Sequence, residues 1–296
     1  MLTGNVPKHL TVGVRTGFLS AFKEAPQVWS RVAMMVQMDA RSHDVVDLGA
    51  APMPTKNPQV VQDFIEKSIT VKPQDWYLTV SLSANAIDDD QTGSLERKAR
   101  QAGRNFDKHI QNRVFTVLNG GDSATYGLCY DGQHFFDLDH VDEGADYQTN
   151  QDNEYALALS LDNFETVKVA AQKFVDDQGE YVNYDYDLIV CAPDLERTAF
   201  NIVGNPEAYD TANRERNPYS GEFDLLTSPQ FDSTAWHLIA SSEEIKPILV
   251  AWRKSPQINA AWFDPQQEEG GIYYWQWHGR YEMYFGDWRL AIQGNT

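Results

Sequence analysis

A single long amphipathic helix is the feature that most constrains how this 296-residue chain can fold. Between residues 93 and 118, apolar side chains recur at spacings of three and four, whereas the opposite face is charged. The apolar positions are Leu95, Ala99, Ala102, Phe106, Ile110, Val114 and Val117. About 25 helical residues span roughly 37 Å, which is long for a globular protein. The pattern predicts a spine against which other elements pack.

Two stretches before the helix have the patterns of strands. Ile65–Val71 and Trp76–Ala84 flank a turn at Lys72–Asp75, and apolar and polar residues alternate strictly in the second stretch. We therefore expect these two strands to pair with each other as a protruding hairpin. An isolated hairpin is marginally stable in water, so it needs a partner surface.

The C-terminal part of the chain also has strand patterns, at 248–252 and 272–285. In the longer segment, one face is predicted to carry large apolar side chains: Tyr273, Trp275, Trp277, Tyr281, Met283 and Phe285. This aromatic area must be covered, either by the spine helix or by another chain.

The first 45 residues are predicted to be an arm without a core of its own. Its apolar side chains, among them Phe18, Phe22 and Trp29, stand in short clusters that prolines and glycines interrupt. Such a segment must lie on something else, either the body of its own chain or a neighbouring chain.

Composition excludes several classes of function. The chain has 24 Lys and Arg against 43 Asp and Glu, a net charge of −19, which does not suit gripping nucleic acid or an anionic membrane. No apolar run is long enough for a membrane span, and no secretory signal is visible. The two cysteines, Cys129 and Cys191, fit a reducing cytoplasm better than a disulfide framework. We therefore expect an acidic, mixed globular protein.

The densest group of chemically active side chains is Cys129–His140, which holds two histidines and three carboxylates. One hypothesis is a divalent metal site. The favoured interpretation is a turn-rich loop whose Asp and His side chains cap the backbone. Cys191 is expected in the core, and no motif predicts a catalytic residue or a cofactor. The tryptophans leave sugar binding as a further hypothesis, although core or interface packing is favoured.

Several segments, taken in order, resemble the major head (capsid) subunit of Mu-like tailed bacteriophages. The most recognisable string is Tyr130–Asp137, followed by Asp139 and His140. The other resembling segments are Thr16–Phe18, Ala25–Pro26, Ser68–Val71, Trp76–Val80, Ala86–Asp90, Leu188–Leu195, Ile245–Leu249, Arg253–Pro256, Arg280–Tyr281 and Trp288–Ala291. The chain departs from the family pattern at 141–160 and 204–234.

The resemblance implies an α+β fold of the Hong Kong ninety-seven phage capsid type. In that fold an axial domain is inserted between two pieces of a peripheral domain that is built on a spine helix and sheet. The implied segments are an N-terminal arm (1–45), an extended β-hairpin loop (46–86), the spine helix region of the peripheral domain (87–121), the axial domain (122–245) and the returning peripheral strands (246–296).

The resemblance also implies a major capsid protein of the virion, made in the host cytoplasm, that self-assembles through hexamers and pentamers into an icosahedral head around double-stranded DNA. Implied partners are portal, scaffolding and decoration proteins, with no sequence-specific DNA contact and no membrane. A protein-nanocompartment shell of the same fold and a metal-dependent enzyme that uses the 129–142 loop are the alternatives. The candidate interface residues are Phe18, Phe22, Trp29, Lys72, Trp76, Arg97, Arg100, Arg104, Trp252 and Arg253.

Overall fold

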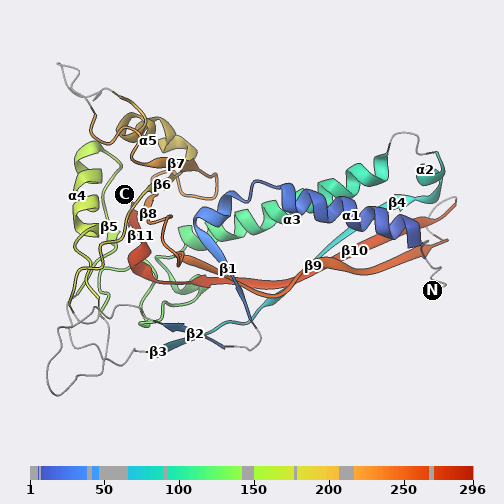
Figure 1. Ribbon diagram of the computed structural model, residues 1–296, viewed down its shortest axis with the longest axis horizontal. Helices are drawn as coiled ribbons and strands as arrows, with labels where there is room; N and C mark the ends of the chain where they lie inside the picture. Colours follow the sequence, from blue (N-terminus) through green and yellow to red (C-terminus); the bar gives the residue numbers. More distant parts are fainter. Residues whose placement is uncertain are drawn as a thin grey trace.

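A computed structural model of the chain has an elongated shape with a compact end (Figure 1). The structure describes residues 6, 8–38, 42–46, 66–89, 93–141, 150–176, 179–206, 217–266 and 270–295, with the backbone alone for 9, 42–46 and 66–70. Two helices lie along a sheet of long strands, and a second sheet with further helices forms the compact end. The C-terminus lies in this end.

Helices and strands alternate irregularly along the chain, as in an α+β fold. The helices are α1 (Lys8–Glu24), η1 (Val28–Arg31), α2 (Ala84–Asp88), α3 (Ser94–Asn119), η2 (Ala124–Tyr126), α4 (Leu161–Ala171), η3 (Pro193–Leu195), α5 (Glu196–Val203) and η4 (Trp288–Leu290). The strands are β1 (Ala33–Gln37), β2 (Ser42–Val46), β3 (Glu66–Thr70), β4 (Gln74–Ser83), β5 (Glu154–Tyr155), β6 (Leu188–Cys191), β7 (Asp224–Thr227), β8 (Trp236–Ile239), β9 (Ile248–Asp264), β10 (Ile272–Phe285) and β11 (Ala291–Gly294).

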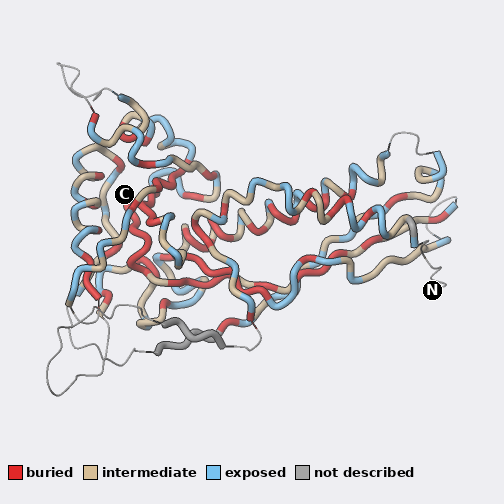
Figure 2. The backbone as a smooth tube through the Cα atoms, viewed as in Figure 1, coloured by how far each residue is buried: buried red, intermediate tan, exposed pale blue. Residues whose placement is uncertain are grey.

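The predicted spine helix is α3, and it covers the aromatic face of β10. Trp275, Trp277 and Tyr281 of that face are fully buried, and the ring of Phe106 on α3 meets the Tyr281 ring with centroids 6.2 Å apart. Figure 2 shows buried residues along the surfaces that α3 and the long strands share. The helices of the same chain, rather than another chain, therefore cover this face.

The N-terminal arm is α1, and it packs on α3 of its own chain. Phe18 is fully buried and stacks on Trp277 with ring centroids 4.9 Å apart. The two helices approach closely because Gly103 faces α1: a Cβ at that position would lie 2.5 Å from the Phe18 carbonyl oxygen. Gly13 and Gly17 of the arm lie inside α1, where they do not act as breaks.

The long sheet has the strand order β1-β9-β10-β4. The segment after α1 continues into β1, which pairs with β9 in parallel, from Ala33 opposite Ile248 to Gln37 opposite Trp252. The β9–β10 ladder is irregular between His278 and Arg280. Pro256 lies in the opposing part of β9 and has no backbone N–H to donate, which accounts for a bulge at this point.

The predicted hairpin of 65–71 with 76–84 is wrong. β3 pairs with β2, from Ser42 opposite Thr70 to Val46 opposite Glu66. β4 pairs instead with β10. The strands themselves are at the predicted places, but β4 carries apolar side chains that the long sheet and α3 can bury, so it joins that sheet.

The compact end is a five-stranded sheet of order β5-β11-β8-β6-β7. All four residues of β6 are buried, including Cys191, which was expected in the core. From Pro193 the chain continues into η3 and α5. Helix α4 begins at Leu161. Its N-cap is Ser160, whose hydroxyl accepts a hydrogen bond from the Asn163 N–H.

Candidate functional site

Three aromatic interface candidates belong to the core of the chain itself. Phe18, Trp29 and Trp252 are at most 4% exposed. The Trp29 indole donates a 3.0 Å hydrogen bond to Asp107, and the Trp252 ring meets Tyr281 at 4.7 Å. Their own chain covers these three side chains, because α1, η1 and β9 fold back against α3 and β10.

Two further aromatic candidates, Phe22 and Trp76, are half-buried against the same core. The Trp76 indole donates to the Tyr281 carbonyl oxygen at 3.1 Å, and its ring lies 4.4 Å from the His109 ring. Burial, followed by the charge of Arg113, lowers the pKa of His109, whose Nδ1 lies 2.9 Å from the Tyr281 hydroxyl. This cluster joins α3 to the long sheet.

The cationic candidates lie at or near the surface. Lys72, Arg97, Arg104 and Arg253 are exposed, and Arg104 donates to the Gln101 side chain at 3.0 Å. Two of the candidate guanidinium groups are tied to their own chain. Arg253 donates to the Met38 carbonyl oxygen at 3.0 Å, and the half-buried Arg100 pairs with Glu24 at 2.7 Å. The structure thus places the aromatic candidates inside and leaves charged ones on the surface.

The Cys129–His140 loop encloses a buried polar network. His140 is 1% exposed, with Nδ1 2.6 Å from Asp131 and Nε2 3.1 Å from the Asn153 side-chain oxygen. Its ring stacks on Trp288 at 4.1 Å. The Asn153 amide donates to three backbone carbonyl oxygens, of Phe135, Trp288 and Ala291. One asparagine therefore holds the loop against the C-terminal segment.

The predicted backbone capping in this loop is confirmed for Asp side chains but not for His140, whose ring contacts the side chains of Asp131 and Asn153. The Asp131 carboxylate accepts from the Gln133 N–H at 3.1 Å, and the Asp137 carboxylate accepts from the N–H groups of His134 and Leu138. The metal hypothesis has no support, because no group of three His, Cys, Asp or Glu side chains in the described part of the chain is arranged to hold an ion. His140 is already engaged on both ring nitrogens.

The sugar-binding hypothesis is wrong. It needs exposed indoles, whereas six of the eight tryptophans are buried and Trp76 and Trp262 are half-buried. Alternation along a strand had favoured core packing, and the structure agrees.

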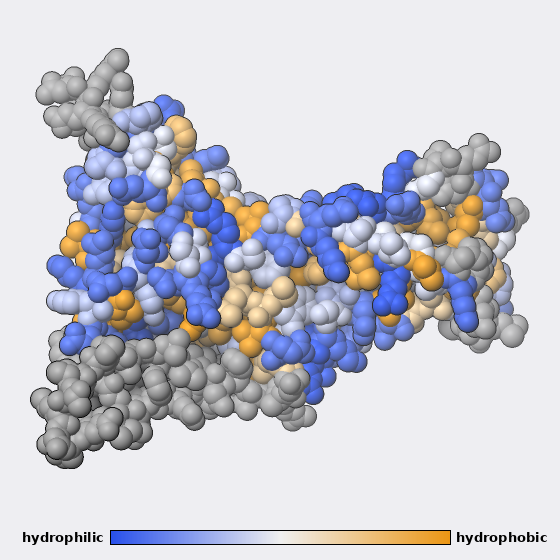
Figure 3. All heavy atoms as spheres, viewed as in Figure 1, coloured by the Kyte–Doolittle hydropathy of each residue, from blue (hydrophilic) through white to orange (hydrophobic). Residues whose placement is uncertain are grey.

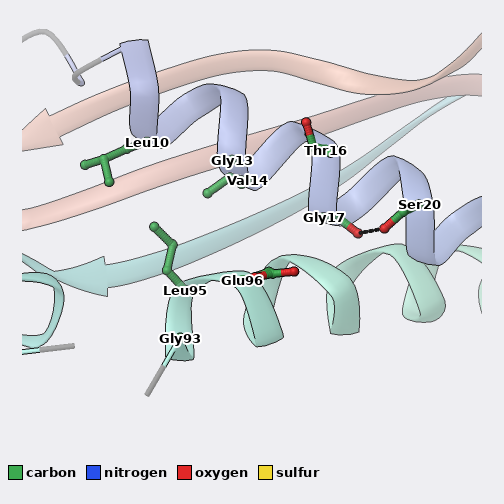
Figure 4. Close-up of a pocket in the computed structure, with 9 residues that line it drawn as sticks. All are labelled: Leu10, Gly13, Val14, Thr16, Gly17, Ser20, Gly93, Leu95 and Glu96. Carbon is green, nitrogen blue, oxygen red and sulfur yellow. Dashed lines mark hydrogen bonds between the residues drawn. The ribbon is translucent and has the colours of Figure 1, made fainter. Parts of the chain in front are cut away.

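A hollow of about 520 Å³ lies between the first turns of α1 and the start of α3 (Figure 4). Small residues form much of its wall, because Gly13 and Gly17 leave space that larger side chains would occupy. Leu10 and Leu95 supply apolar surface, and Glu96 supplies a carboxylate. Periodicity alone did not reveal this feature, since it depends on how two helices 70 residues apart in sequence pack.

Comparison with known proteins identifies the relatives of the chain. Residues 8–158, just over half of it, match the family of Mu-like prophage major head subunits, gpT. The chain belongs to this family. The matched region runs from α1 through the Cys129–His140 loop to β5. It therefore contains the spine helix and the polar network.

Two curated relatives match segments of similar length in this chain. The chain is 26% identical over 141 residues to the Mu-like prophage FluMu major head subunit of Haemophilus influenzae, covering 47% of the chain and 45% of the relative. It is 26% identical over 135 residues to the major capsid protein of Escherichia phage Mu, covering 45% and 43%. The matched segments thus span less than half the length of these relatives.

Solved structures show the fold. The chain resembles a subunit of the bacteriophage JBD30 procapsid with a TM-score of 0.56 and 20% identity, covering 98% of this chain and 76% of the other. It also resembles the SrpI encapsulin of Synechococcus elongatus, with a TM-score of 0.52 and 8% identity, covering 92% and 87%. The predicted fold class, α+β of the Hong Kong ninety-seven capsid type, is confirmed.

None of the helices in the described residues combines the length and the apolar character needed to span a membrane.

Proposed function

We propose that the chain is the major capsid protein of a tailed phage, and that it self-assembles into an icosahedral head around double-stranded DNA. The observation that carries this proposal is the match of residues 8–158 to the major head subunit family. The fold shared with the JBD30 procapsid subunit supports it. In this role the chain is a structural protein and has no catalytic residues.

The elongated architecture suits a shell subunit, because α3 and the long sheet supply a rigid wall. We propose the division into arm (1–45), extended loop, peripheral domain and axial domain (122–245), with 246–296 returning to the peripheral domain. Because β2 pairs with β3 and β4 pairs with β10, we place the extended loop at 42–70, so that the arm ends before Ser42. Strand β4 then belongs to the peripheral domain.

The proposed assembly uses identical copies in hexamers and pentamers, with portal and scaffolding proteins and possible decoration proteins as further partners. The net charge of −19 supports an interior that encloses DNA without gripping it sequence-specifically. The proposed location is the virion, after synthesis in the host cytoplasm and without a membrane association.

A nanocompartment shell is the second candidate function. The likeness to the SrpI encapsulin favours it, because one fold serves both kinds of shell. The two kinds of shell differ in what they enclose: DNA in a phage head and a cargo protein in a nanocompartment.

Negative-stain microscopy of the purified chain, with sedimentation velocity, tests the proposal. We expect closed shells that sediment far ahead of the 33.6 kDa subunit. Particles isolated from cells that produce virions should contain nuclease-resistant DNA. Particles filled with a cargo enzyme would support the nanocompartment instead, and a chain that remains monomeric at all concentrations would contradict both.

A further inference from the structure

The charge of the chain is divided unevenly between its two ends. Helices α1 and α3 carry nine Lys and Arg against three Asp and Glu. Residues 120–247 instead carry 26 of the 43 acidic residues and only six Lys and Arg. Figure 3 shows hydrophilic residues along α3 as well as over the compact end. Residues 120–247 therefore repel the same region of another copy, whereas the surface of α1 and α3 attracts it.

A hollow on the basic side offers a defined place for an acidic group. It has a volume of about 230 Å³ and lies between the end of α1 and the middle of α3, with Ala21, Ala25 and Pro26 as apolar walls and the cations Arg104 and Lys108 beside them. We call these five residues the basic groove. Both cations are exposed, and in the described part of the chain no acidic side chain lies within salt-bridge distance of either.

Two acidic residues that also line this hollow are already engaged. Glu24 pairs with Arg100 at 2.7 Å. Asp107 is 3% exposed and accepts the Trp29 indole N–H. Neither therefore offsets the charge of Arg104 and Lys108 at the mouth of the groove.

The compact end carries a complementary face at the start of α5. Asp194 and Glu196 are exposed, and no cation among the described residues pairs with them. Phe200 lies one helical turn after Glu196, on the same face, and is 55% exposed. We call these three residues the acidic–aromatic face. A large exposed aromatic ring beside charged groups is typical of an interface anchor.

The acidic surface of α4 is less suited to this contact. Glu165 of α4 is half-buried, and its negative charge adds to burial in raising the pKa of Tyr219. The neighbouring Lys168 pairs with Glu222 at 3.7 Å and adds a positive charge to the same surface. The start of α5 also has a cation, Arg197, but Asp194 and Glu196 are exposed there and no described cation pairs with them, and Phe200 adds a large exposed apolar ring.

We propose that the acidic–aromatic face of one copy docks into the basic groove of a second copy, with Asp194 and Glu196 against Arg104 and Lys108 and Phe200 against the apolar walls. The groove and α5 are fixed on separate elements of the chain (Figure 1), so the contact needs two copies. It joins different surfaces, as rings of five or six copies require. This inference rests on the proposed shell function and names one contact within it.

Charge exchange tests the contact. The first variant is Arg104→Glu with Lys108→Glu, and the second is Asp194→Lys with Glu196→Lys. Each places like charges in the contact, so each should lower the yield of sedimenting shells by more than about tenfold. The combination of all four substitutions restores opposite charges with the original net charge, and assembly should return to near the yield of the unchanged protein.

A matched control combines Arg104→Glu and Lys108→Glu with Asp162→Lys and Glu180→Lys, which change exposed acids elsewhere in the acidic region. It has the same net charge and should not restore assembly. Thermal unfolding of every variant identifies those that fail to fold. The variant Phe200→Ala adds a test that leaves charge unchanged and should also lower the yield.

Unimpaired assembly of either charge-reversed pair would overturn this contact while leaving the proposed function intact. Equal recovery by the matched control would also overturn it, because net charge alone would then explain the result. So would binding of a 30-base-pair DNA duplex that Arg104→Glu and Lys108→Glu abolish while shells still form, since the groove would then be a DNA site. Failure of the unchanged protein to form shells would reject the proposed function and this contact together.

Discussion

The long sheet with its two helices and the compact end bury their interiors in different ways. Between α1, α3 and β10 the contacts are aromatic stacks, such as Phe18 on Trp277. In the compact end, the loop of His140 is held to the C-terminal segment by hydrogen bonds that converge on Asn153. The first region depends on apolar area and close helix packing, whereas the second adds to its apolar core a few polar side chains with fixed partners.

The largest expected effect is the loss of an aromatic ring from the long sheet. Trp277→Ala should lower the free energy of unfolding by about 3–5 kcal/mol, because it removes a fully buried ring and leaves a cavity beside Phe18. Denaturant unfolding measures this loss. Trp262→Ala is the matched control and should cost clearly less, since Trp262 is half-buried. Equal losses would show that the apolar packing described here is not what stabilises this region.

The next largest expected effect is the loss of the hydrogen bonds that Asn153 makes in the buried polar network. Asn153→Ala should cost about 3 kcal/mol, because three buried carbonyl oxygens lose their donor and His140 loses a partner. Asn150→Ala removes one exposed hydrogen bond to the Leu138 carbonyl oxygen and should cost less than about 1 kcal/mol. If the two variants unfold at the same denaturant concentration, the network contributes little.

A buried histidine should make the compact end sensitive to acid. Burial lowers the pKa of His237 to about 3, and neither ring nitrogen has a hydrogen-bond partner in the described residues. The unfolded chain binds a proton at this site below about pH 6.5 and the folded chain does not, so stability falls as the pH decreases from there. At pH 5 the loss is about 2 kcal/mol.

His237→Phe should remove this part of the acid sensitivity. The ring lies between Phe136 and Phe231, at 5.2 and 4.9 Å, so an apolar ring suits the site. The measurement is unfolding at pH 7.5 and pH 5 for both proteins. An unchanged difference between the two pH values would contradict the assignment.

The smallest expected effects come from alanine substitutions at two glycines, which should change the free energy of unfolding in opposite directions. Gly103→Ala should destabilise the chain by about 1 kcal/mol, because crowding against the Phe18 carbonyl oxygen outweighs the gain in helix propensity. Gly13→Ala should stabilise by roughly 0.5–1 kcal/mol, because no atom lies within 4 Å of the added Cβ. Thermal unfolding separates the two, and the same sign for both would argue against close packing of α1 on α3.

Sequence patterns predicted where helices and strands lie better than they predicted which strands pair. The periodicity from Leu95 to Val117 placed α3 almost to the residue, and alternation placed β10 and its buried face. The pairing of β4 was missed because alternation shows that a strand has an apolar face, and not which strand adjoins its edge. The parallel pairing of β1 with β9 joins residues about 215 apart in the chain, for which a single sequence holds no signal.

The candidate surface was predicted in part. A segment without its own core needs cover, and for Phe18 and Trp29 the chain itself supplies that cover. The capping in the Cys129–His140 loop followed from turn chemistry. The role of Asn153 could not be predicted, since it lies 13 residues beyond His140 and no spacing rule links them.

Cryo-electron microscopy of particles assembled from the purified chain tests the central claim most directly. A closed shell is predicted in which α3 and the β9–β10 strands of each copy run within the wall, and in which copies are arranged in rings of five and six. A compact monomer, or an open oligomer that encloses no space, would contradict it.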